Sequence, residues 1–395
     1  MANLRIGVIG YGLRGGLAAH AHRPGAGSVV VALCDPSPAA GRRFREQFGS
    51  DVTVDTELAS FIQRDLDAAF VLSPDFLHHE HARFLLERDV AVYLEKPMAI
   101  TTADCDDLLA LARRRSGRLY VGHNMRHMPF VREMKRLIDA GAIGTPKAAW
   151  CRHFVSTGGD YYFSDWHAER RHTTSLLLQK GAHDIDIIHW LMGSYTQSTT
   201  AMGGLTVYGD NPDRASADRP AIPWRDRETL LDRWPPAAQT RLNPVIDVED
   251  VSMMLMTLRN GTFASYQQSH FTPDYWRNYT VIGDAGRIEN FGNGGEGTTI
   301  RVFDRRTDRW APDEATIIPI DPGDGGHGGA DPAIVAEFLR YVREGGATET
   351  SPVAARYAVA AGCAATESLR NGGGAVDVPP VPEDIGTFFD PAGMT

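Results

Sequence analysis

The sequence predicts an α/β domain built on a Rossmann-type parallel sheet over residues 1–124, followed by an α+β domain with a large, mostly antiparallel open sheet over residues 125–395. Two observations support this prediction. Short apolar strands alternate with amphipathic helices in the first part, which is the pattern of βαβ units. After Asn124 the alternation ends, and longer apolar runs separated by turn residues predict an antiparallel sheet with helices on one face.

The elements of the first domain follow from its apolar runs and their spacing. Strands are expected at 4–9, 28–34, 68–72, 90–94 and 118–122, with a weaker one at 52–54. Apolar residues at helical spacing predict helices over 76–88 and 102–115. Thr102 is the expected N-cap of the second helix, because Asp104 and Asp106 then lie in its first turn, where the helix dipole favours negative charge.

The second domain combines helices with long strands. Helices are expected over 129–140 (ended by Gly141), 173–192, 331–344 and 352–370, and strands near 147–155, 197–208, 249–258, 262–270, 276–283 and 299–304. Asn260-Gly261, between two apolar runs, predicts a type I′ hairpin, in which both central residues need positive φ. Residues 209–246 are rich in Pro, Asp and Arg and are expected to run outside the sheet.

Composition and charge narrow the class of protein. The 395-residue chain has a net charge of −10 without a basic patch, which argues against nucleic acid as a partner. Its four cysteines are widely separated and form no Cys-x-x-Cys, which predicts reduced thiols. No apolar run could span a bilayer, and the first strand at Leu4 leaves no room for a signal peptide, so a cytoplasmic protein without membrane contact is expected.

A glycine-rich loop follows the first predicted strand. It reads Gly10-Tyr11-Gly12-Leu13-Arg14-Gly15 and matches G-x-G-x-x-G. The first Gly permits a tight turn, the second lets the backbone approach a pyrophosphate, and the third brings helix and strand together. The following helix would present free N–H groups to phosphates. We therefore expect the segment from Gly10 to Arg14 to contact a dinucleotide, although glycine clusters also form ordinary turns.

The end of the second strand indicates which dinucleotide binds. Asp35 lies 20 residues beyond Gly15. A carboxylate there accepts hydrogen bonds from the adenosine ribose hydroxyls and repels a 2′-phosphate. The next residues, Pro36-Ser37-Pro38, include no Arg to bind such a phosphate. NAD is therefore the expected cofactor, in preference to NADP.

Two further loops lie at the carboxyl ends of predicted strands, where doubly wound sheets bind their ligands. Ser73-Pro74 is expected either to contact the cofactor or to form a plain turn. His78 is expected near the nicotinamide end. Only His78 and His81 would share a helix face and no Cys lies nearby, so no metal site is expected. Glu95-Lys96-Pro97 ends a buried strand and places an ammonium group at the same sheet edge.

Together these motifs resemble the glucose–fructose oxidoreductase/inositol dehydrogenase (Gfo/Idh/MocA) family. Besides the glycine loop, Ser73-Pro74 with His78, and Glu95-Lys96-Pro97, the matching blocks are Gly122-His123-Asn124-Met125-Arg126, Ile138-Asp139-Ala140-Gly141-Ala142-Ile143-Gly144, Gly181-Ala182-His183-Asp184-Ile185-Asp186 and Gly283-Asp284-Ala285-Gly286-Arg287-Ile288-Glu289. The combination extends through most of the chain and is much more specific than any one motif.

The resemblance implies an oxidoreductase whose second domain covers the nicotinamide, with Glu95, Lys96 and Asn124 at the cofactor. In such enzymes the Lys of Glu-Lys-Pro, often followed by a cis bond, and a helix His flank the reacting carbon, which assigns Lys96 and His183 as catalytic residues. The family commonly has Asp four residues before this His, where this chain has Gln179. Gln cannot act as a carboxylate base. Either Lys96 and His183 suffice, or Asp184, Asp186 or Lys180 takes over part of the role.

Substrate contacts are expected from several segments of the second domain. The aromatic loop 161–167 would line the substrate pocket or pack at the domain junction. Arg170 is a weaker candidate, because an exposed structural role is favoured for it. The full set of expected substrate-binding residues is Lys96, Arg126, Asp165, Trp166, Gln179, His183, His270 and Arg277.

We expect an NAD-dependent dehydrogenase of a sugar, sugar derivative or cyclitol, working in either direction. Two alternatives remain: an NAD-retaining glycosidase that uses transient oxidation and elimination, and a non-catalytic NAD-binding regulatory protein. The open sheet of the second domain would bury itself efficiently against a copy, so a homodimer or homotetramer is expected.

Overall fold

The computed structural model describes residues 3–222, 224, 233–323, 327–390 and 394. The chain forms two compact units, and neither is a continuous segment. The first comprises Met1–His127, Asp324–Arg356 and Val381–Gly393; the second comprises Met128–Gly323, Tyr357–Pro380 and Met394–Thr395. No helix in the described part of the chain is both long and apolar enough to cross a membrane.

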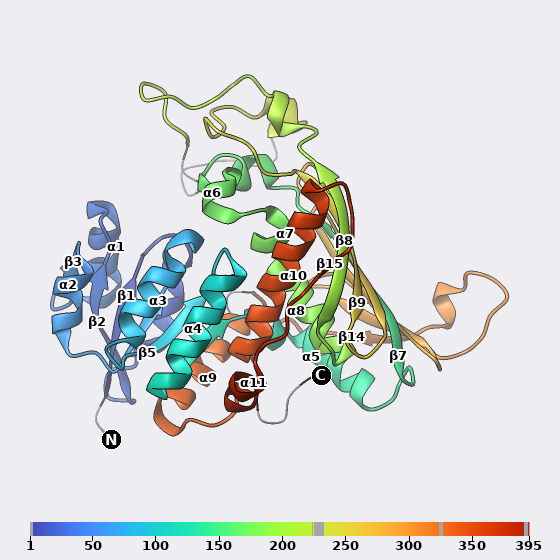
Figure 1. The fold of residues 1–395 in the computed structure, drawn as a ribbon, viewed down its shortest axis with the longest axis horizontal. Helices are drawn as coiled ribbons and strands as arrows, with labels where there is room; N and C mark the ends of the chain where they lie inside the picture. Colours follow the sequence, from blue (N-terminus) through green and yellow to red (C-terminus); the bar gives the residue numbers. More distant parts are fainter. Residues whose placement is uncertain (1–2, 223, 225–232, 324–326, 391–393, 395) are drawn as a thin grey trace. The chain divides into compact units, whose positions relative to one another are not determined.

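The first unit has a six-stranded parallel sheet, as predicted (Figure 1). Its strands are β1 (Leu4–Ile9), β2 (Ser28–Cys34), β3 (Thr53–Asp55), β4 (Ala68–Val71), β5 (Ala91–Glu95) and β6 (Leu119–Gly122), in the order β3-β2-β1-β4-β5-β6. The strand order reverses between β1 and β4. In open α/β sheets this reversal forms the ligand crevice, outside the carboxyl ends of the strands.

The helices of this unit come from both ends of the chain. They are α1 (Pro38–Phe48), α2 (Leu58–Phe61), α3 (His78–Leu86), α4 (Thr102–Arg115), α9 (Ala330–Glu344) and α11 (Glu383–Phe389), with 3₁₀ turns η1 (Leu13–Ala21), η2 (Ile62–Arg64), η3 (Asp75–Leu77) and η4 (Asn124–His127). Phe338 of α9 packs against Phe70 and Tyr93 of the sheet, at ring-centroid distances of 5.3 and 5.5 Å. A late helix therefore completes the core of the nucleotide-binding unit.

The second unit has a nine-stranded mixed sheet. Its strands are β7 (Pro146–Phe154), β8 (Thr196–Gly204), β9 (Val251–Leu258), β10 (Phe263–Ser269), β11 (Trp276–Gly283), β12 (Arg287–Phe291), β13 (Thr299–Phe303), β14 (Thr316–Pro319) and β15 (Val376–Asp377). The order is β14-β13-β12-β11-β7-β10-β9-β8-β15, and only the β7–β10 pair is parallel. The prediction of a mostly antiparallel sheet is confirmed.

Helices cover one side of this sheet. They are α5 (Pro129–Asp139), α6 (Arg170–Thr173), α7 (Leu176–Gln179), α8 (Gly181–Met192) and most of α10 (Pro352–Arg370), and Figure 1 shows α7, α8 and α10 on the same side. α10 packs closely on α7 at Gly362, which has no side chain. A Cβ at this position would lie only 2.8 Å from the Cα of Leu178. The described residues of 209–246 run outside the sheet, as predicted.

The helix predicted after the glycine loop is present as the 3₁₀ helix η1. Three local predictions were wrong. Thr101, not Thr102, caps α4, because its hydroxyl oxygen accepts the Asp104 N–H at 3.1 Å. Gly261 has positive φ but Asn260 does not, so the hairpin is not type I′. The helix expected over 173–192 begins only at Leu176, after a turn at Thr174 with a φ of 63°, and it is divided into α7 and α8 at Lys180.

Candidate functional site

The glycine loop lies at the reversal of strand order in the first unit. Gly10 has a φ of 83°, and a Cβ there would lie 2.7 Å from the backbone nitrogen of Ser73, which follows β4. A Cβ on Gly15 would lie 2.7 Å from the ring of Tyr11. A Cβ on Gly12 would meet nothing within 4 Å. Two glycines thus permit tight packing, and the middle one faces open space, as expected of a backbone that a pyrophosphate approaches.

Asp35 lies beside this loop, as expected for a ribose-binding carboxylate. Its Oδ2 accepts the Tyr11 N–H at 2.7 Å, and its Oδ1 accepts the Ser37 N–H at 2.8 Å. Each oxygen keeps a further lone pair for a ribose hydroxyl. Arg43, which the sequence argument did not consider, donates to the Tyr11 carbonyl oxygen at 3.2 Å. The loop, the carboxylate and the open space at Gly12 fit a bound dinucleotide.

Lys96 follows β5 in a tightly hydrogen-bonded turn. Its backbone N–H donates to Oε2 of the buried Glu95 at 2.6 Å, and the Lys96–Pro97 peptide bond is cis. Arg14 donates to Glu95 at 2.6 Å and to both oxygens of Asp331, at 2.9 and 3.0 Å. Asn124 donates to Asp331 at 3.0 Å. Four residues expected at the cofactor are thus linked by hydrogen bonds: Arg14, Glu95 and Asn124 through their side chains, and Lys96 through its backbone. Asp331 of α9, the partner that Arg14 and Asn124 share, was not predicted.

His78 connects two of the loops at this sheet edge. Its Nδ1 lies 2.7 Å from the Pro97 carbonyl oxygen, and its Nε2 lies 2.9 Å from that of Ser73. Burial lowers the pKa of His78 to about 4, although both carbonyl groups act in the opposite direction. The ring is therefore neutral near pH 7. A neutral ring has a single N–H and can donate to only one of the two carbonyl oxygens, so His78 packs between the Ser73-Pro74 loop and the turn that carries Lys96.

A buried charged network lies beneath α8 in the second unit. The Asp184 carboxylate binds Arg277 Nε at 3.0 Å and His153 Nδ1 at 2.9 Å, and it also accepts the Tyr279 hydroxyl. Cys151, His153, Arg277 and Tyr279 share one face of the sheet, because they alternate along the neighbouring strands β7 and β11. Asp184, a candidate on α8, and Arg277, a candidate on β11, therefore belong to one cluster.

Electrostatics fix the charge of this network. Burial alone raises the pKa of Asp184, but Arg277 and His153 outweigh this effect and hold that pKa well below its ordinary value. Burial and the Arg277 cation lower the pKa of His153 to about 3. Asp184 is therefore an anion and His153 is neutral near pH 7. With its oxygens engaged, Asp184 is not the base that replaces the family's missing Asp.

The residues from Gln179 to His183 that frame the start of α8 differ in burial and in the side chains that they contact. His183 is half-buried on α8, and Gln179 is buried at the end of α7. Gly181 permits a close approach, since a Cβ there would lie 3.1 Å from the ring of Tyr266. Lys180 lies between the two helices, with its ammonium near the rings of Tyr162 and Tyr275. Burial and Arg277 lower the pKa of Lys180 to about 7.

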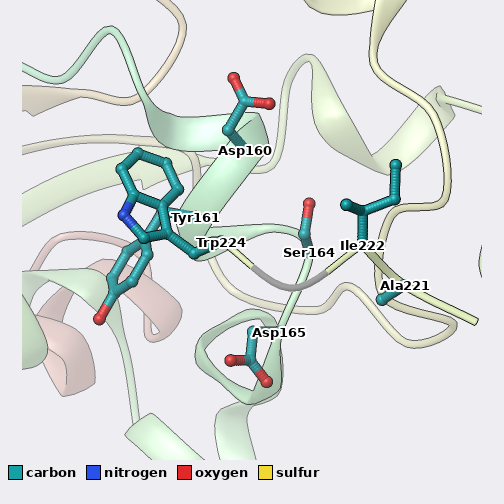
Figure 2. A pocket seen from close by; sticks show the side chains of 7 residues that line it. All are labelled: Asp160, Tyr161, Ser164, Asp165, Ala221, Ile222 and Trp224. Atoms are coloured by element: carbon teal, nitrogen blue, oxygen red, sulfur yellow. The ribbon is translucent and has the colours of Figure 1, made fainter. Parts of the chain in front are cut away.

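The aromatic loop lines a pocket of about 200 Å³ (Figure 2). The lining residues are Asp160, Tyr161, Ser164, Asp165, Ala221, Ile222 and Trp224. Tyr161 and Trp224 pack edge to face, with ring centroids 5.3 Å apart. Asp165 lines this pocket, whereas Trp166 is not among the lining residues and stacks on His167, with ring centroids 3.7 Å apart. Trp224 and Asp160 were not predicted.

The remaining candidates have structural partners. Arg126 is buried in the first unit and donates to the Glu349 carbonyl oxygen at 2.6 Å. Arg170 binds Glu249 at 3.1 Å, in line with the structural role favoured for it. Over the described ranges, no group of three His, Cys, Asp or Glu side chains could hold a metal ion.

A parallel sheet with a glycine loop and ribose carboxylate, followed by a large open sheet, defines a two-unit dinucleotide-binding protein. The family model described as "Oxidoreductase family, NAD-binding Rossmann fold" matches residues 4–123, and "Oxidoreductase family, C-terminal alpha/beta domain" matches residues 135–378. The chain belongs to this Gfo/Idh/MocA oxidoreductase family. It is an NAD-binding oxidoreductase, and the resemblance inferred from the motifs is confirmed.

Similar proteins include sugar- and cyclitol-related enzymes. Inositol 2-dehydrogenase 1 of Saccharopolyspora erythraea is 31% identical over 48% of this chain and 55% of its own length. The 2,7-anhydro-N-acetylneuraminate hydratase of Mediterraneibacter gnavus is 27% identical over 54% of this chain and 57% of its own. These alignments span little more than half of each relative. Levoglucosan dehydrogenase, solved with NADH and levoglucosan, has a TM-score of 0.77 and 20% identity, covering 96% of this chain and 100% of that chain, which shows a shared fold.

Proposed function

We propose that this protein is an NAD-dependent dehydrogenase that oxidises a secondary hydroxyl of a sugar, sugar derivative or cyclitol, or reduces the corresponding ketone. The observation that carries the proposal is the place of Lys96. It follows β5 at the carboxyl edge of the sheet, the same edge that bears the glycine loop after β1. The inositol and levoglucosan dehydrogenases among its relatives support a carbohydrate or cyclitol substrate.

The proposed chemistry assigns a role to each catalytic residue. NAD would supply the hydride acceptor. Removal of hydride from a secondary alcohol needs a base to take the hydroxyl proton, and such a base works best with a pKa near the operating pH. Lys96 positions the hydroxyl and His183 takes the proton, or the two exchange these roles. Asp165, Trp166, Gln179, His270, Arg126 and Arg277 remain the proposed substrate contacts.

The test is a panel of monosaccharides, acidic sugars, inositols and aryl glycosides incubated with NAD. NADH absorbance that accumulates with a free sugar or cyclitol supports the dehydrogenase. Aglycone release without net NADH would instead support the NAD-retaining glycosidase. The hydratase among the relatives keeps this second candidate open, because its name denotes a reaction without net oxidation. Tight NAD binding without turnover of any compound would favour a regulatory protein.

We propose NAD rather than NADP as the cofactor, and we propose that Asp35 determines this preference. Replacing Asp35 with Ser should lower the affinity for NADH by about 10- to 100-fold, since hydrogen bonds to a charged group contribute about 1.5–3 kcal/mol. The same change removes the repulsion of a 2′-phosphate, so NADPH affinity should rise. Fluorescence titration of the wild type and the variant with NADH and with NADPH measures both affinities. Asp51→Ser, on an exposed turn, is the matched control. Unchanged cofactor preference in Asp35→Ser would refute the assignment.

We also propose a homodimer or homotetramer formed through the open face of the second sheet. Met202, Leu255 and Phe263 lie on adjacent strands of that face and are 67%, 63% and 60% exposed. Leu255→Glu should convert the assembly to monomers in light scattering at micromolar concentration, because a charge replaces apolar surface. Phe388→Glu, which lies on α11 of the first unit, should leave the assembly intact. A monomeric wild-type protein would contradict the proposal.

A further inference from the structure

Among the residues that the structure describes, the Lys180 ammonium has aromatic neighbours but no ion-pair partner. Its ammonium lies 5.7 Å from the ring centroid of Tyr162 and 5.9 Å from that of Tyr275. Over the described ranges it makes no hydrogen bond or ion pair, although the side chain is only partly exposed. Cation–π contacts of this kind stabilise a partly buried cation but leave its N–H donors without an acceptor.

The nearest negative charge cannot serve as its partner. Asp184 interacts electrostatically with Lys180, but its oxygens are already engaged by Arg277, His153 and the Tyr279 hydroxyl. Two cations, Lys180 and Arg277, therefore surround one carboxylate. Below about pH 7, where Lys180 is protonated and His153 is still neutral, this cluster has a surplus of one positive charge. A buried surplus charge is costly unless a ligand of opposite sign compensates it.

A second, independent feature points to a ligand at the same place. His270 follows β10 with 0% exposure, and in the described structure neither of its ring nitrogens has a hydrogen-bond partner in the protein. Its ring packs edge to face on Tyr162 at 4.9 Å, and Lys180 contributes to lowering its pKa. An unsatisfied buried polar group costs about 1–3 kcal/mol. His270 and Lys180 thus offer unused donors next to the same tyrosine ring, that of Tyr162.

We infer that Lys180, together with Tyr162, Tyr275 and His270, forms a subsite for a carboxylate group of the substrate. This inference rests on the proposed function and narrows its substrate class to sugar acids, such as uronates and aldonates. One surplus positive charge matches one carboxylate, whereas a phosphate monoester carries close to two negative charges near neutral pH. The Lys180 ammonium would donate to the carboxylate, and a neutral His270 would donate one N–H.

The subsite has a defined pH dependence. The charged and titratable groups facing Lys180 are Arg277 of β11, Asp184 of α8, His153 of β7, His270, Tyr162 and Tyr275. The pKa values of both histidines lie below the physiological range. Lys180, with a pKa of about 7, is thus the group that changes charge between pH 6.5 and 8.5. Carboxylate affinity should therefore fall as pH rises through 7, because the neutral amine replaces the ammonium.

The experiment is calorimetric titration of the NADH-saturated full chain with matched pairs of acid and neutral sugar: glucuronate and glucose, galacturonate and galactose, gluconate and glucitol. At pH 6.5 at least one acid should bind about 10- to 100-fold more tightly than its neutral counterpart. Lys180→Met should reduce this ratio to about 1. Lys180→Arg should keep the preference and abolish its decline between pH 6.5 and 8.5, since Arg stays charged. Lys147→Met, an exposed lysine of β7, is the control.

The outcomes separate this inference from the proposed function. Equal binding of acid and neutral sugars, binding of neither, or an unchanged ratio in Lys180→Met would each overturn the carboxylate subsite. If neutral sugars still reduce NAD in that case, the dehydrogenase proposal stands without the subsite. If acids bind through Lys180 but no compound of the panel yields NADH, the subsite stands and the dehydrogenase fails. Native NADH affinity and thermal midpoint in each variant verify that it is folded.

Discussion

Lys96→Met lowers kcat for substrate oxidation by about 10²- to 10⁴-fold, the usual contribution of a positioned proton-transfer group. The side chain follows β5, and its backbone is fixed by Glu95 and the cis bond to Pro97. Methionine has a similar length but can neither orient a hydroxyl nor exchange a proton. We expect His183→Ala to cause a loss in the same range.

Stopped-flow measurement of NADH formation, with a separate titration of NADH affinity, checks this prediction. The separate titration matters because Lys96 is also proposed to contact the cofactor. The double variant should lose less than the product of the two single effects, because residues that act on one proton transfer are not additive. Lys147→Met again controls for the loss of a lysine. Near-normal turnover in either single variant, with intact NADH binding, would refute that residue's role.

Asp184→Asn should destabilise the second unit by about 3–5 kcal/mol, because it leaves Arg277 buried without its charged partner. All seven tryptophans of the chain lie in the second unit, so tryptophan fluorescence during urea unfolding reports on this unit alone. The control is Asp139→Asn, which removes an exposed partner of Lys135 on α5 and should cost less than about 0.5 kcal/mol. Equal midpoints for the two variants would contradict the expected role of the network.

The pH dependence of this effect follows from the direction of the pKa shift. The pKa of Asp184 is lower in the folded protein than in the unfolded chain, so its stabilisation is fully present above the unfolded value of about 3.9. It is lost as pH falls toward the folded value. Measured from pH 5 downward, below the titration of Lys180 near pH 7, the difference in unfolding free energy between wild type and Asp184→Asn should shrink below about pH 4. A constant difference down to pH 3 would argue against this linkage.

The local features of both units could be predicted because they depend on neighbouring residues. The strand over 28–34 and the helix over 102–115 have the predicted bounds, since apolar spacing and charge at the helix ends are visible in the sequence. β14 and β15 were missed because they are four and two residues long, too short to show a periodicity. β12 was missed as well; it is five residues long and lies shortly after the strand predicted over 276–283.

The site residues divide in the same way. Gly10, Asp35 and Lys96 were found because each follows a predicted strand, and the ends of parallel strands meet at one sheet edge. His153 carried a weaker signal: it alternates with Cys151 on a predicted strand, which could have placed it on the helix-covered face. Asp331 carried none, because it reaches Arg14 across 317 residues of sequence.

The sequence by itself determined the family, the two sheet types and the motifs of the nucleotide site, because these depend on residue patterns of a few to about twenty positions. Only the tertiary structure decided that α9 completes the core of the first unit, and that Asp184 belongs to Arg277 and His153. It also revealed that the Lys180 ammonium has no ion-pair partner within the described part of the chain. The net charge of such a buried cluster depends on residues from different strands and helices, and burial determines how strongly these charges interact. Both conditions are met only once the chain is folded.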